Sequence, residues 1–423
     1  MQADRPRDLR GIAAWCLYDW ANSAFNTVIG TFVFSVYFAR GVYGDETGGS
    51  AVWAYALAAA GFAIVLLSPV LGAVADRVGR RKPWIAVFTL LTVIPTAMLW
   101  WAMPAQDAVA YTLICVVLAT IAFELGVVFY NAMLPGVAPR GMIGRVSGWG
   151  WGVGYFGGLA CLAVALVGFV QTDEPWFGVG TESAANIRAT APLVAVWVAV
   201  FAVPLFLFTP DEPSRGIGLG QAVREGLRQL AATARNVGQY ANILRYLIAS
   251  AIYRDGMNTL FAVGGLYAAG VFGMDFAEIM IFAIALNVTA GLGSVAFAWI
   301  DDWIGSKRTV VYSLIGTIAT GLPILLIEDK GWFFALAVIL GIFVGPVQAA
   351  SRSMMARLAP DTIRTEMFGL YALSGKAVAF LGPLCYGLAT DAFGTQRAGM
   401  ASVLAFFTIG LIGLYWVKEE RAG

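Results

Sequence analysis

Long apolar segments recur along almost the whole chain, and they constrain its fold more than any other feature of the sequence. The segments are about 20 residues long, which is the length that an α-helix needs to cross a bilayer, and they run from Trp15 to the C-terminal region. Hydrophobic residues make up 59% of the chain and charged residues 13%, against roughly 45–50% and about 25% in a typical soluble domain. The sequence therefore predicts an all-α membrane protein.

We predict twelve transmembrane helices in two pseudo-symmetric bundles of six. Their expected positions are 12–38, 51–75, 84–103, 108–134, 145–170, 191–209, 243–271, 276–300, 308–327, 332–355, 365–390 and 396–417. The longest polar interruption is 210–242, so the N-terminal bundle is expected at 1–209 and the C-terminal bundle at 243–423. Apolar residues recur in this linker at helical spacing, which fits either a helix on the membrane surface or a solvated linker with some helicity. These residues are Leu219, Val223, Leu227 and Leu230.

Lysine and arginine predict the orientation, because cytoplasmic loops of membrane proteins carry an excess of both. If the N-terminus is inside, the cytoplasmic segments hold 20 of the 27 basic residues and the outer loops hold four. The remaining three, Arg254, Arg352 and Lys376, fall inside predicted membrane helices. We therefore expect a multi-pass protein of a bacterial inner membrane that works as a monomer, with both termini in the cytoplasm.

Several sequence patterns repeat between the two halves of the chain. The loop after the second helix reads Gly72-x-x-x-Asp76-Arg77-x-Gly79-Arg80-Arg81-Lys82. The loop after the eighth helix repeats it, at one constant displacement along the chain, as Ala298-x-x-x-Asp302-x-x-Gly305-x-Lys307-Arg308. A second set, with a constant displacement of its own, pairs Pro139 with Pro360, Gly148 with Gly369 and Gly154 with Gly375, while Asp19-x-x-Asn22 corresponds to Asp255-x-x-Asn258. Together these repeats predict two equivalent bundles with a binding site between them.

The loop from Gly72 to Lys82 resembles the signature loop of the major facilitator superfamily, and its weaker copy lies where that superfamily repeats it. Further segments are similar to the vacuole-effluxer branch, whose fungal members are linked to autophagy and to amino-acid export from the vacuole. These segments are Trp15-x-x-Tyr18-Asp19-Trp20-Ala21-Asn22-Ser23-Ala24, Tyr253-Arg254-Asp255-Gly256, Ser351-Arg352-Ser353, and Gly375-Lys376 followed by Gly382-Pro383. The resemblance implies a secondary transporter that moves a small solute by alternating access, with amino acids as leading candidates and protons as the expected coupling ion.

The resemblance also implies a cytoplasmic gate, held closed by a carboxylate at a helix N-terminus and by nearby cations. The residues assigned to this gate are Gly72, Asp76, Arg77, Gly79, Arg80, Asp302, Gly305 and Arg352. Positive-inside topology alone accounts for the arginines of the first loop, but it does not account for the glycines and the aspartate at their spacing.

A charge inside a membrane helix costs about 2.5–3.5 kcal/mol on insertion scales and should face a cavity or a partner. Six charged residues fall inside predicted helices: Asp19, Glu124, Asp255, Arg254, Arg352 and Lys376. Their formal charges sum to zero, so they either neutralise one another as structural ion pairs or line the path of a solute. Asn22 and Asn258 share helix faces with Asp19 and Asp255. The residues assigned to the substrate and proton pathway are Asp19, Asn22, Glu124, Arg254, Asp255, Asn258 and Lys376.

Two of these residues receive specific roles. Glu124 lies near mid-membrane in the fourth helix and is the first choice for a proton carrier, since the chain has no histidine. Lys376 lies near the middle of the eleventh helix, beside small residues such as Gly369 and Ala372. We expect it to recognise an anionic group of the solute, most simply a carboxylate, and to pair with Asp255 or Glu124 when the site is empty.

Other function classes are less favoured by the sequence. It contains no metal-ligand cluster, cofactor motif or nucleophile–base pair, its four cysteines are isolated, and its formal net charge of +1 gives no reason to expect nucleic acid as a partner. We therefore expect no enzyme activity and no cofactor. An efflux pump for drugs or metabolites is the alternative if the cavity charge is net negative. A transporter-like sensor that binds a solute without moving it is a further alternative.

Overall fold

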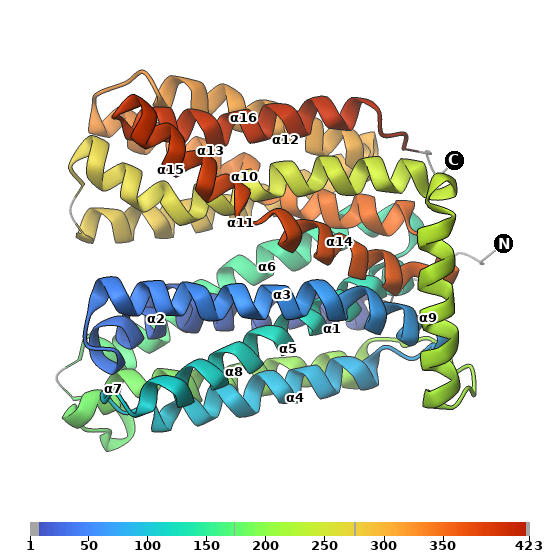
Figure 1. Cartoon of the computed structure of the whole chain (residues 1–423), viewed down its shortest axis with the longest axis horizontal. Coiled ribbons are helices and arrows are strands. Elements are labelled where there is room, and N and C mark those ends of the chain that lie inside the picture. Colours follow the sequence, from blue (N-terminus) through green and yellow to red (C-terminus); the bar gives the residue numbers. More distant parts are fainter. Residues whose placement is uncertain (1–7, 173, 275, 420–423) are drawn as a thin grey trace.

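The computed structural model describes residues 8–172, 174–274 and 276–419, and all regular structure in these ranges is helical. Figure 1 shows two groups of long helices lying side by side, here named the N-bundle and the C-bundle. The N-bundle contains α1 (Leu9–Ala24), α2 (Phe34–Tyr37), α3 (Glu46–Val78), α4 (Lys82–Met98), α5 (Ala108–Val137), α6 (Ile143–Ala165), α7 (Ala185–Arg188) and α8 (Thr190–Phe208). The C-bundle contains α10 (Ala241–Phe272), α11 (Phe276–Ile304), α12 (Ser306–Ile324), α13 (Lys330–Leu358), α14 (Arg364–Val378), α15 (Leu381–Phe393) and α16 (Gln396–Tyr415).

Ten helical segments of the described chain are long and apolar enough to cross a membrane. They correspond to ten of the predicted membrane helices and confirm an all-helical membrane fold. The seventh and ninth predicted helices form α10 and α12 but are not among the ten. α10 carries Arg254 and Asp255 near its centre, and α12 has Lys307 and Arg308 in its first turn. The count of twelve membrane helices therefore stays a prediction.

Two helices that the sequence predicts as continuous are interrupted. After α1 the chain forms a π-helix over Phe25–Phe32, a form whose i→i+5 hydrogen bonds are rare and often found at functional sites. The predicted helix at 365–390 is divided into α14 and α15, because Pro383 lacks an N–H and its ring displaces the carbonyl four residues earlier. The buried Asp255 carboxylate accepts a hydrogen bond from Gly382 N at 2.8 Å and so caps α15.

The linker between the bundles contains α9 (Leu219–Arg235), which crosses one end of both bundles in Figure 1. We name this end, which also carries residues 8 and 419, the α9 end, and the opposite end the far end. α9 packs on α3, since Arg77 donates to Gln229 Oε1 at 2.8 Å and a Cβ on Gly226 would lie 2.9 Å from Val74 N. The linker therefore forms an ordered helix on the N-bundle, with Leu219 exposed on its surface.

Asp76, in the last turn of α3, caps a helix of the opposite bundle. Its carboxylate accepts hydrogen bonds from the backbone N–H groups of Thr365 at 3.0 Å and Glu366 at 2.9 Å, in the first turn of α14. The buried Arg81 guanidinium lies 3.4 Å from the same carboxylate and donates to the Thr365 hydroxyl at 2.9 Å. Arg81 also pairs with Glu212 at 2.5 Å. A negative charge beside the free N–H groups of a helix start is stabilising.

Asp302, in the last turn of α11, caps α6 in the same way. It accepts hydrogen bonds from the backbone N–H groups of Gly144 at 2.7 Å and Arg145 at 3.0 Å. The Arg145 and Arg357 side chains pair with it at 2.8 and 3.0 Å. Asp76 and Asp302 occupy equivalent positions in the two repeated loops. The helix starts that they cap, those of α14 and α6, belong to the second set of repeats. The repeated sequence pattern therefore forms a repeated contact. We name the contacts of Asp76 with α14 and of Asp302 with α6 the interbundle caps.

Glycine is required where the two bundles approach most closely. A Cβ on Gly148 of α6 would lie 2.5 Å from Ser294 O of α11, and a Cβ on Gly369 of α14 would lie 2.5 Å from Ser68 O of α3. These two glycines are a predicted repeat pair, so the two interfaces are equivalent. Gly72 packs on the first turn of α14 at a similar distance. Small residues at these positions let the helix backbones approach one another.

The other predicted gate residues of the two loops lie where the capping helices end. Gly79 follows α3 with a φ of 93° and Gly305 follows α11 with a φ of 95°, a conformation that favours glycine. Arg77 contacts α9 and Arg80 is exposed, so the arginine that reaches the cap is Arg81. A run of basic residues in the sequence does not reveal which of its members becomes buried.

Replacing Asp76 by Asn should loosen the start of α14, because the amide has no charge and only one acceptor oxygen. A charge at a helix start contributes about 0.3–1 kcal/mol, and up to about 2 when partly buried. Backbone hydrogen exchange at Thr365 and Glu366 should therefore accelerate about 2- to 30-fold. Asp302→Asn should have the same effect at Gly144, and mass spectrometry on the protein in nanodiscs measures both.

Asp211→Asn is the matched control. Asp211 also caps a helix, α4, by accepting hydrogen bonds from Arg81 N at 2.9 Å and Lys82 N at 3.1 Å, but it lies in the linker directly after α8 and caps a helix of the N-bundle rather than one of the C-bundle. Its replacement should leave exchange at the start of α14 unchanged. Unchanged exchange there in Asp76→Asn, or the same acceleration in Asp211→Asn, would contradict a cap that acts between the bundles.

Candidate functional site

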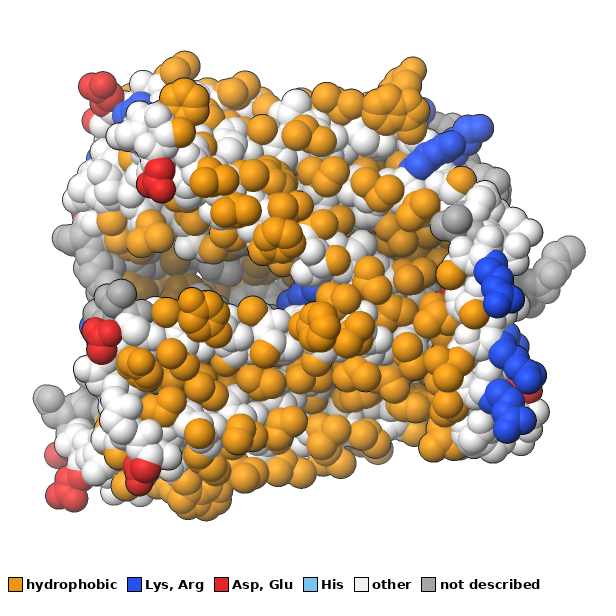
Figure 2. Space-filling view, viewed as in Figure 1, with side chains coloured by type: hydrophobic (Ala, Val, Ile, Leu, Met, Phe, Trp, Pro, Cys, Tyr) orange, Lys and Arg blue, Asp and Glu red, His pale blue; other side chains and the backbone are white. Residues whose placement is uncertain are grey.

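A cavity of about 880 Å³ lies between the two bundles. Its walls come from α1, the π-helix, α5 and α6 on one side and from α10, α11, α12, α13, α14 and α16 on the other. The lining begins with Asp19 and Arg352 toward the α9 end and continues to Phe32, Gly265 and Phe282 toward the far end. Figure 2 shows the surface hollowed between the bundles on the side away from α9.

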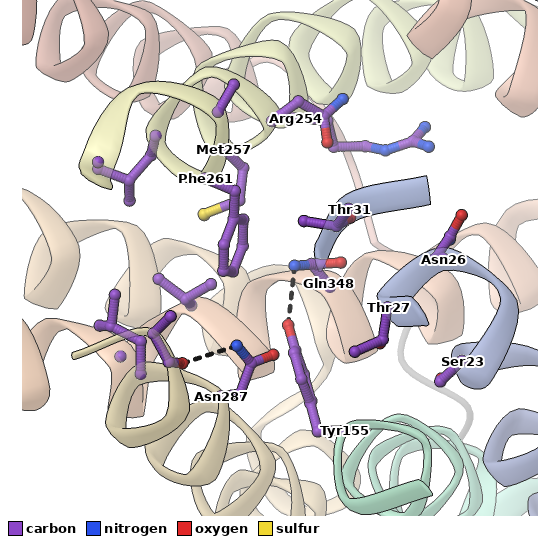
Figure 3. A pocket seen from close by; sticks show the side chains of 18 of the residues that line it. Ser23, Asn26, Thr27, Thr31, Tyr155, Arg254, Met257, Phe261, Asn287 and Gln348 are labelled. Carbon is purple, nitrogen blue, oxygen red and sulfur yellow. Dashed lines mark hydrogen bonds between the residues drawn. The ribbon is translucent and has the colours of Figure 1, made fainter. Parts of the chain in front are cut away.

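The wall formed by α1 and the π-helix is polar. Its lining residues are Asn22, Ser23, Asn26, Thr27 and Thr31. Figure 3 shows the last four projecting from one segment. Spacings of three to five residues keep them on one face through the wider turns of the π-helix. These amides and hydroxyls can donate and accept hydrogen bonds, so the wall can bind a polar solute without adding charge.

Arg352 and Asp19 form an ion pair between the bundles at the cavity floor, the end of the cavity nearest α9. Arg352 Nη1 lies 2.9 Å from Asp19 Oδ2, and the side chains are 4% and 19% exposed. Arg352 also donates to the Ser147 carbonyl at 2.7 Å, and its guanidinium lies 4.8 Å from the Trp15 ring centre. Arg352, a predicted gate residue, therefore joins α13 to α1 and α6 between the cavity and the interbundle caps.

Lys376 and Glu124 form a second ion pair between the bundles, on the cavity wall. Lys376 Nζ of α14 lies 2.6 Å from Glu124 Oε1 of α5, and the side chains are 35% and 24% exposed. Of the two partners predicted for Lys376, the structure therefore shows Glu124 and not Asp255. Because the pair is only partly covered and faces the cavity, a solute or water can reach both groups.

A third polar contact on the cavity wall joins Tyr155 of α6 to Gln348 of α13, and neither residue is among the predicted site residues. Gln348 Nε2 donates to the Tyr155 hydroxyl at 3.1 Å, as Figure 3 shows. Tyr155 directly follows Gly154 in the chain, just as Lys376 follows Gly375, and these two glycines are a predicted repeat pair. Tyr155 and Lys376 therefore occupy equivalent positions, and each contacts the opposite bundle. The constant displacement between the repeats is the sequence signal that identifies Tyr155.

α10 presents Arg254 and Asn258 to the cavity but not Asp255. Asp255 is fully buried, caps α15, and leaves its Oδ1 atom without a hydrogen-bond partner. Successive residues of an α-helix point about 100° apart, so Asp255 points away from the helix face on which Arg254 and Asn258 lie. The structure therefore places Asp255 outside the wall of the pathway to which it was assigned.

The charged groups of the lining are two acids and three bases, so their formal charges sum to +1. They are Asp19, Glu124, Arg254, Arg352 and Lys376. The two ion pairs account for four of the five charges. Across the described ranges, no group of three or more His, Cys, Asp or Glu side chains is arranged to hold a metal ion. The site thus offers hydrogen-bonding groups, two ion pairs and one additional cation.

A membrane fold of two helical bundles, with a polar and charged cavity between them, is that of a solute transporter of the major facilitator type. The chain belongs to the vacuole effluxer Atg22-like family, whose model matches residues 8–423. This confirms the resemblance found in the sequence.

Curated relatives include both bacterial and fungal proteins. An uncharacterised MFS-type transporter of Bacillus subtilis, YxiO, is 27% identical over 420 residues, which cover 97% of this chain and 95% of that protein. Autophagy-related protein 22 of Cryptococcus neoformans is 26% identical over 297 residues, which cover 66% of this chain and 53% of that protein. The match thus spans about half the length of the fungal relative.

Solved transporter structures share the fold. FucP, a major facilitator transporter in the outward conformation, superposes with a TM-score of 0.76 at 13% identity, covering 97% of this chain and 99% of that chain. The proton:xylose symporter XylE superposes with a TM-score of 0.74 at 16% identity, covering 98% and 96%. At these identities the likeness establishes the fold alone.

Asp19→Asn should destabilise the protein by about 2–3 kcal/mol, because it leaves the buried Arg352 guanidinium without a counter-charge. This is less than the roughly 3–5 kcal/mol of a fully buried pair, since Asp19 is 19% exposed. Equilibrium unfolding in mixed micelles measures the change. The double variant Asp19→Asn/Arg352→Gln should lose less stability than the sum of the single variants. Additive losses would show that the two residues act independently.

Proposed function

We propose that the chain moves a small polar solute across the membrane by alternating access. The observation that carries this proposal is a polar, charged cavity between two equivalent bundles, with the repeated helix caps at its α9 end. With the α9 end joined by the caps and the surface hollowed away from it (Figure 2), a solute enters from the far end. Separation of the bundles at the α9 end would expose the same cavity to the other side.

The α9 end is the proposed cytoplasmic end. Arg224 and Arg228 of α9 are exposed there, and Figure 2 shows basic side chains at this end and acidic ones at the far end. Cytoplasmic loops carry the basic excess, so both termini would be cytoplasmic. Because one chain supplies both bundles, the proposed transport unit is a monomer, and the Bacillus relative favours a bacterial plasma membrane, which is the inner membrane where a bacterium has two.

Protons are the proposed coupling ion, and Glu124 is the proposed carrier. Glu124 is paired with Lys376 at 2.6 Å in the cavity wall. An anionic solute group that reaches Lys376 would replace Glu124, and the released carboxylate would take up a proton because an unpaired charge is costly away from bulk water. The two bundles would then reorient while the cavity holds both the solute and the proton. This exchange uses no histidine, and the chain contains none.

Amino acids or related small metabolites are the proposed solutes. The cavity wall offers cations for a carboxylate, carboxylates for an ammonium group, and a row of amides and hydroxyls. The resemblance to vacuole effluxers favours the same class of solute. An efflux pump for cationic compounds is less favoured, because the formal charge of the lining is +1 and not negative. A solute sensor would share this cavity, and only a flux measurement separates it from a transporter.

Glu124→Gln should abolish accumulation driven by a pH gradient while leaving solute exchange measurable, since exchange does not require release of the proton. The assay is uptake of a radiolabelled amino-acid mixture into proteoliposomes, with and without an imposed gradient, and counterflow without one. In the variant, gradient-driven uptake should fall to the equilibrium level.

Glu182→Gln is the control, because Glu182 is exposed in a short helical turn between α6 and α8 and is not part of the cavity lining. It should retain gradient-driven uptake. If Glu124→Gln also retains it, Glu124 is structural and Asp19 becomes the better carrier. If neither the unmodified protein nor the control moves any amino acid, the amino-acid proposal is wrong.

A further inference from the structure

We propose that Arg254 is the anion-binding group of the cavity, and that the transported solute therefore carries a carboxylate or a comparable monoanionic group. This inference rests on the proposed transport of a solute through the cavity, and it names the class of that solute. In this inference, the solute contacts Arg254 first and Lys376 afterwards.

The charges of the lining single out Arg254. Arg352 is paired with Asp19 at 2.9 Å and Lys376 with Glu124 at 2.6 Å, so both of these cations already have a carboxylate from the opposite bundle. Among the described residues, no ion pair includes Arg254, although it is half-buried in the cavity wall. The net positive charge of the lining is therefore concentrated at one guanidinium.

Neighbouring groups hold the Arg254 guanidinium in place without neutralising it. It lies 3.9 Å from the centre of the Tyr371 ring, and its Nη1 atom donates to the Tyr371 carbonyl at 3.1 Å. Gly375 leaves room for it, since a Cβ there would lie 3.1 Å from Nη1. A guanidinium has five N–H donors in a planar fork that fits a carboxylate. With one N–H bonded to the Tyr371 carbonyl, the stacked Arg254 guanidinium keeps further N–H groups that can bind a ligand.

The surroundings of Arg254 fit a small anion that also has an apolar part. Figure 3 shows Arg254, Met257 and Phe261 projecting from α10, and Asn26 and Thr31 projecting from the polar wall. The cavity that receives Arg254 thus also presents apolar side chains of the same helix and the hydrogen-bonding groups of the polar wall. Since α10 belongs to the C-bundle and the polar wall to the N-bundle, such a solute would contact both bundles.

Arg254 and Lys376 would act in succession. An anion can bind Arg254 without displacing any carboxylate, whereas binding to Lys376 requires displacement of Glu124. Gly375, which packs on Arg254, is the neighbour of Lys376 in the chain. Arg254 would therefore hold the anion first, next to the helical segment that carries Lys376. Binding would precede the exchange that releases Glu124 for protonation.

Chemical protection of Arg254 tests this assignment on the full chain. The purified protein is treated with phenylglyoxal, which modifies accessible arginines, and peptide mass spectrometry reads modification at Arg254. The probes are acetate against acetamide and L-alanine against L-alaninamide, at matched concentration and ionic strength. Carboxylates should protect Arg254 while the amides do not. The exposed Arg224 of α9 is the internal control and should react equally under all conditions.

Variants provide a second measurement of the same property. Arg254→Gln should weaken carboxylate binding about 10- to 100-fold, which corresponds to the loss of a hydrogen bond to a charged group. Calorimetric titration of monodisperse protein measures this change. The preference for carboxylate over amide should disappear with it. Arg254→Lys should keep part of the preference, because it retains the charge but loses the planar fork. Arg224→Gln should change neither value.

The outcomes separate this inference from the proposed function. Protection by acetate but not by L-alanine would support the anion site and remove amino acids as solutes. An unreactive Arg254, or equal effects of carboxylates and amides, would overturn the anion site even if the protein transports amino acids. If Arg254→Gln does not fold, protection in the unmodified chain and binding by Arg254→Lys still decide between these results.

Discussion

The structure depends on one constraint: the free N–H groups at the start of a buried helix need an acceptor, and here that acceptor belongs to the other bundle. Asp76 supplies it to α14 and Asp302 supplies it to α6. Asp76, Thr365 and Glu366 are buried, so water does not replace this partner while the α9 end is closed. The bundles therefore remain in contact at the α9 end as long as the carboxylates stay in place. Because the two caps are repeat-related, opening the α9 end breaks two equivalent contacts between the bundles.

Further polar contacts between the bundles follow one another from the interbundle caps toward the middle of the cavity. The cavity floor is formed by the pair of Arg352 and Asp19, and the wall carries the pair of Lys376 and Glu124. Only the second pair is substantially accessible, so it is the one that a solute can change directly. A solute that removes Glu124 from Lys376 weakens a contact between bundles while it binds. In the proposed mechanism, these groups on the bundle interface would connect binding in the cavity to opening of the α9 end.

The sequence was sufficient to predict the membrane fold, the two repeated loops and most of the charged cavity lining. Two constant displacements along the chain predicted equivalent loops and equivalent glycines, because both depend on local patterns preserved in each half. Other features depend on contacts between distant segments. The capping role of Asp255 follows from the break in the eleventh predicted helix, and the burial of Arg81 follows from acceptors on α3, α14 and the linker. Neither the helical spacing nor the composition of a single segment contains that information.

Cross-linking the α9 end tests the central claim that this end must open during transport. Cysteines replacing Arg145 and Asp302, in a background without the four native cysteines, would join α6 to α11 by a short reducible reagent. With the cross-link formed, flux through proteoliposomes should stop, and reduction should restore it. Binding of solute from the far end should persist in the cross-linked protein. Undiminished flux through fully cross-linked protein would contradict alternating access by separation of the bundles at the α9 end.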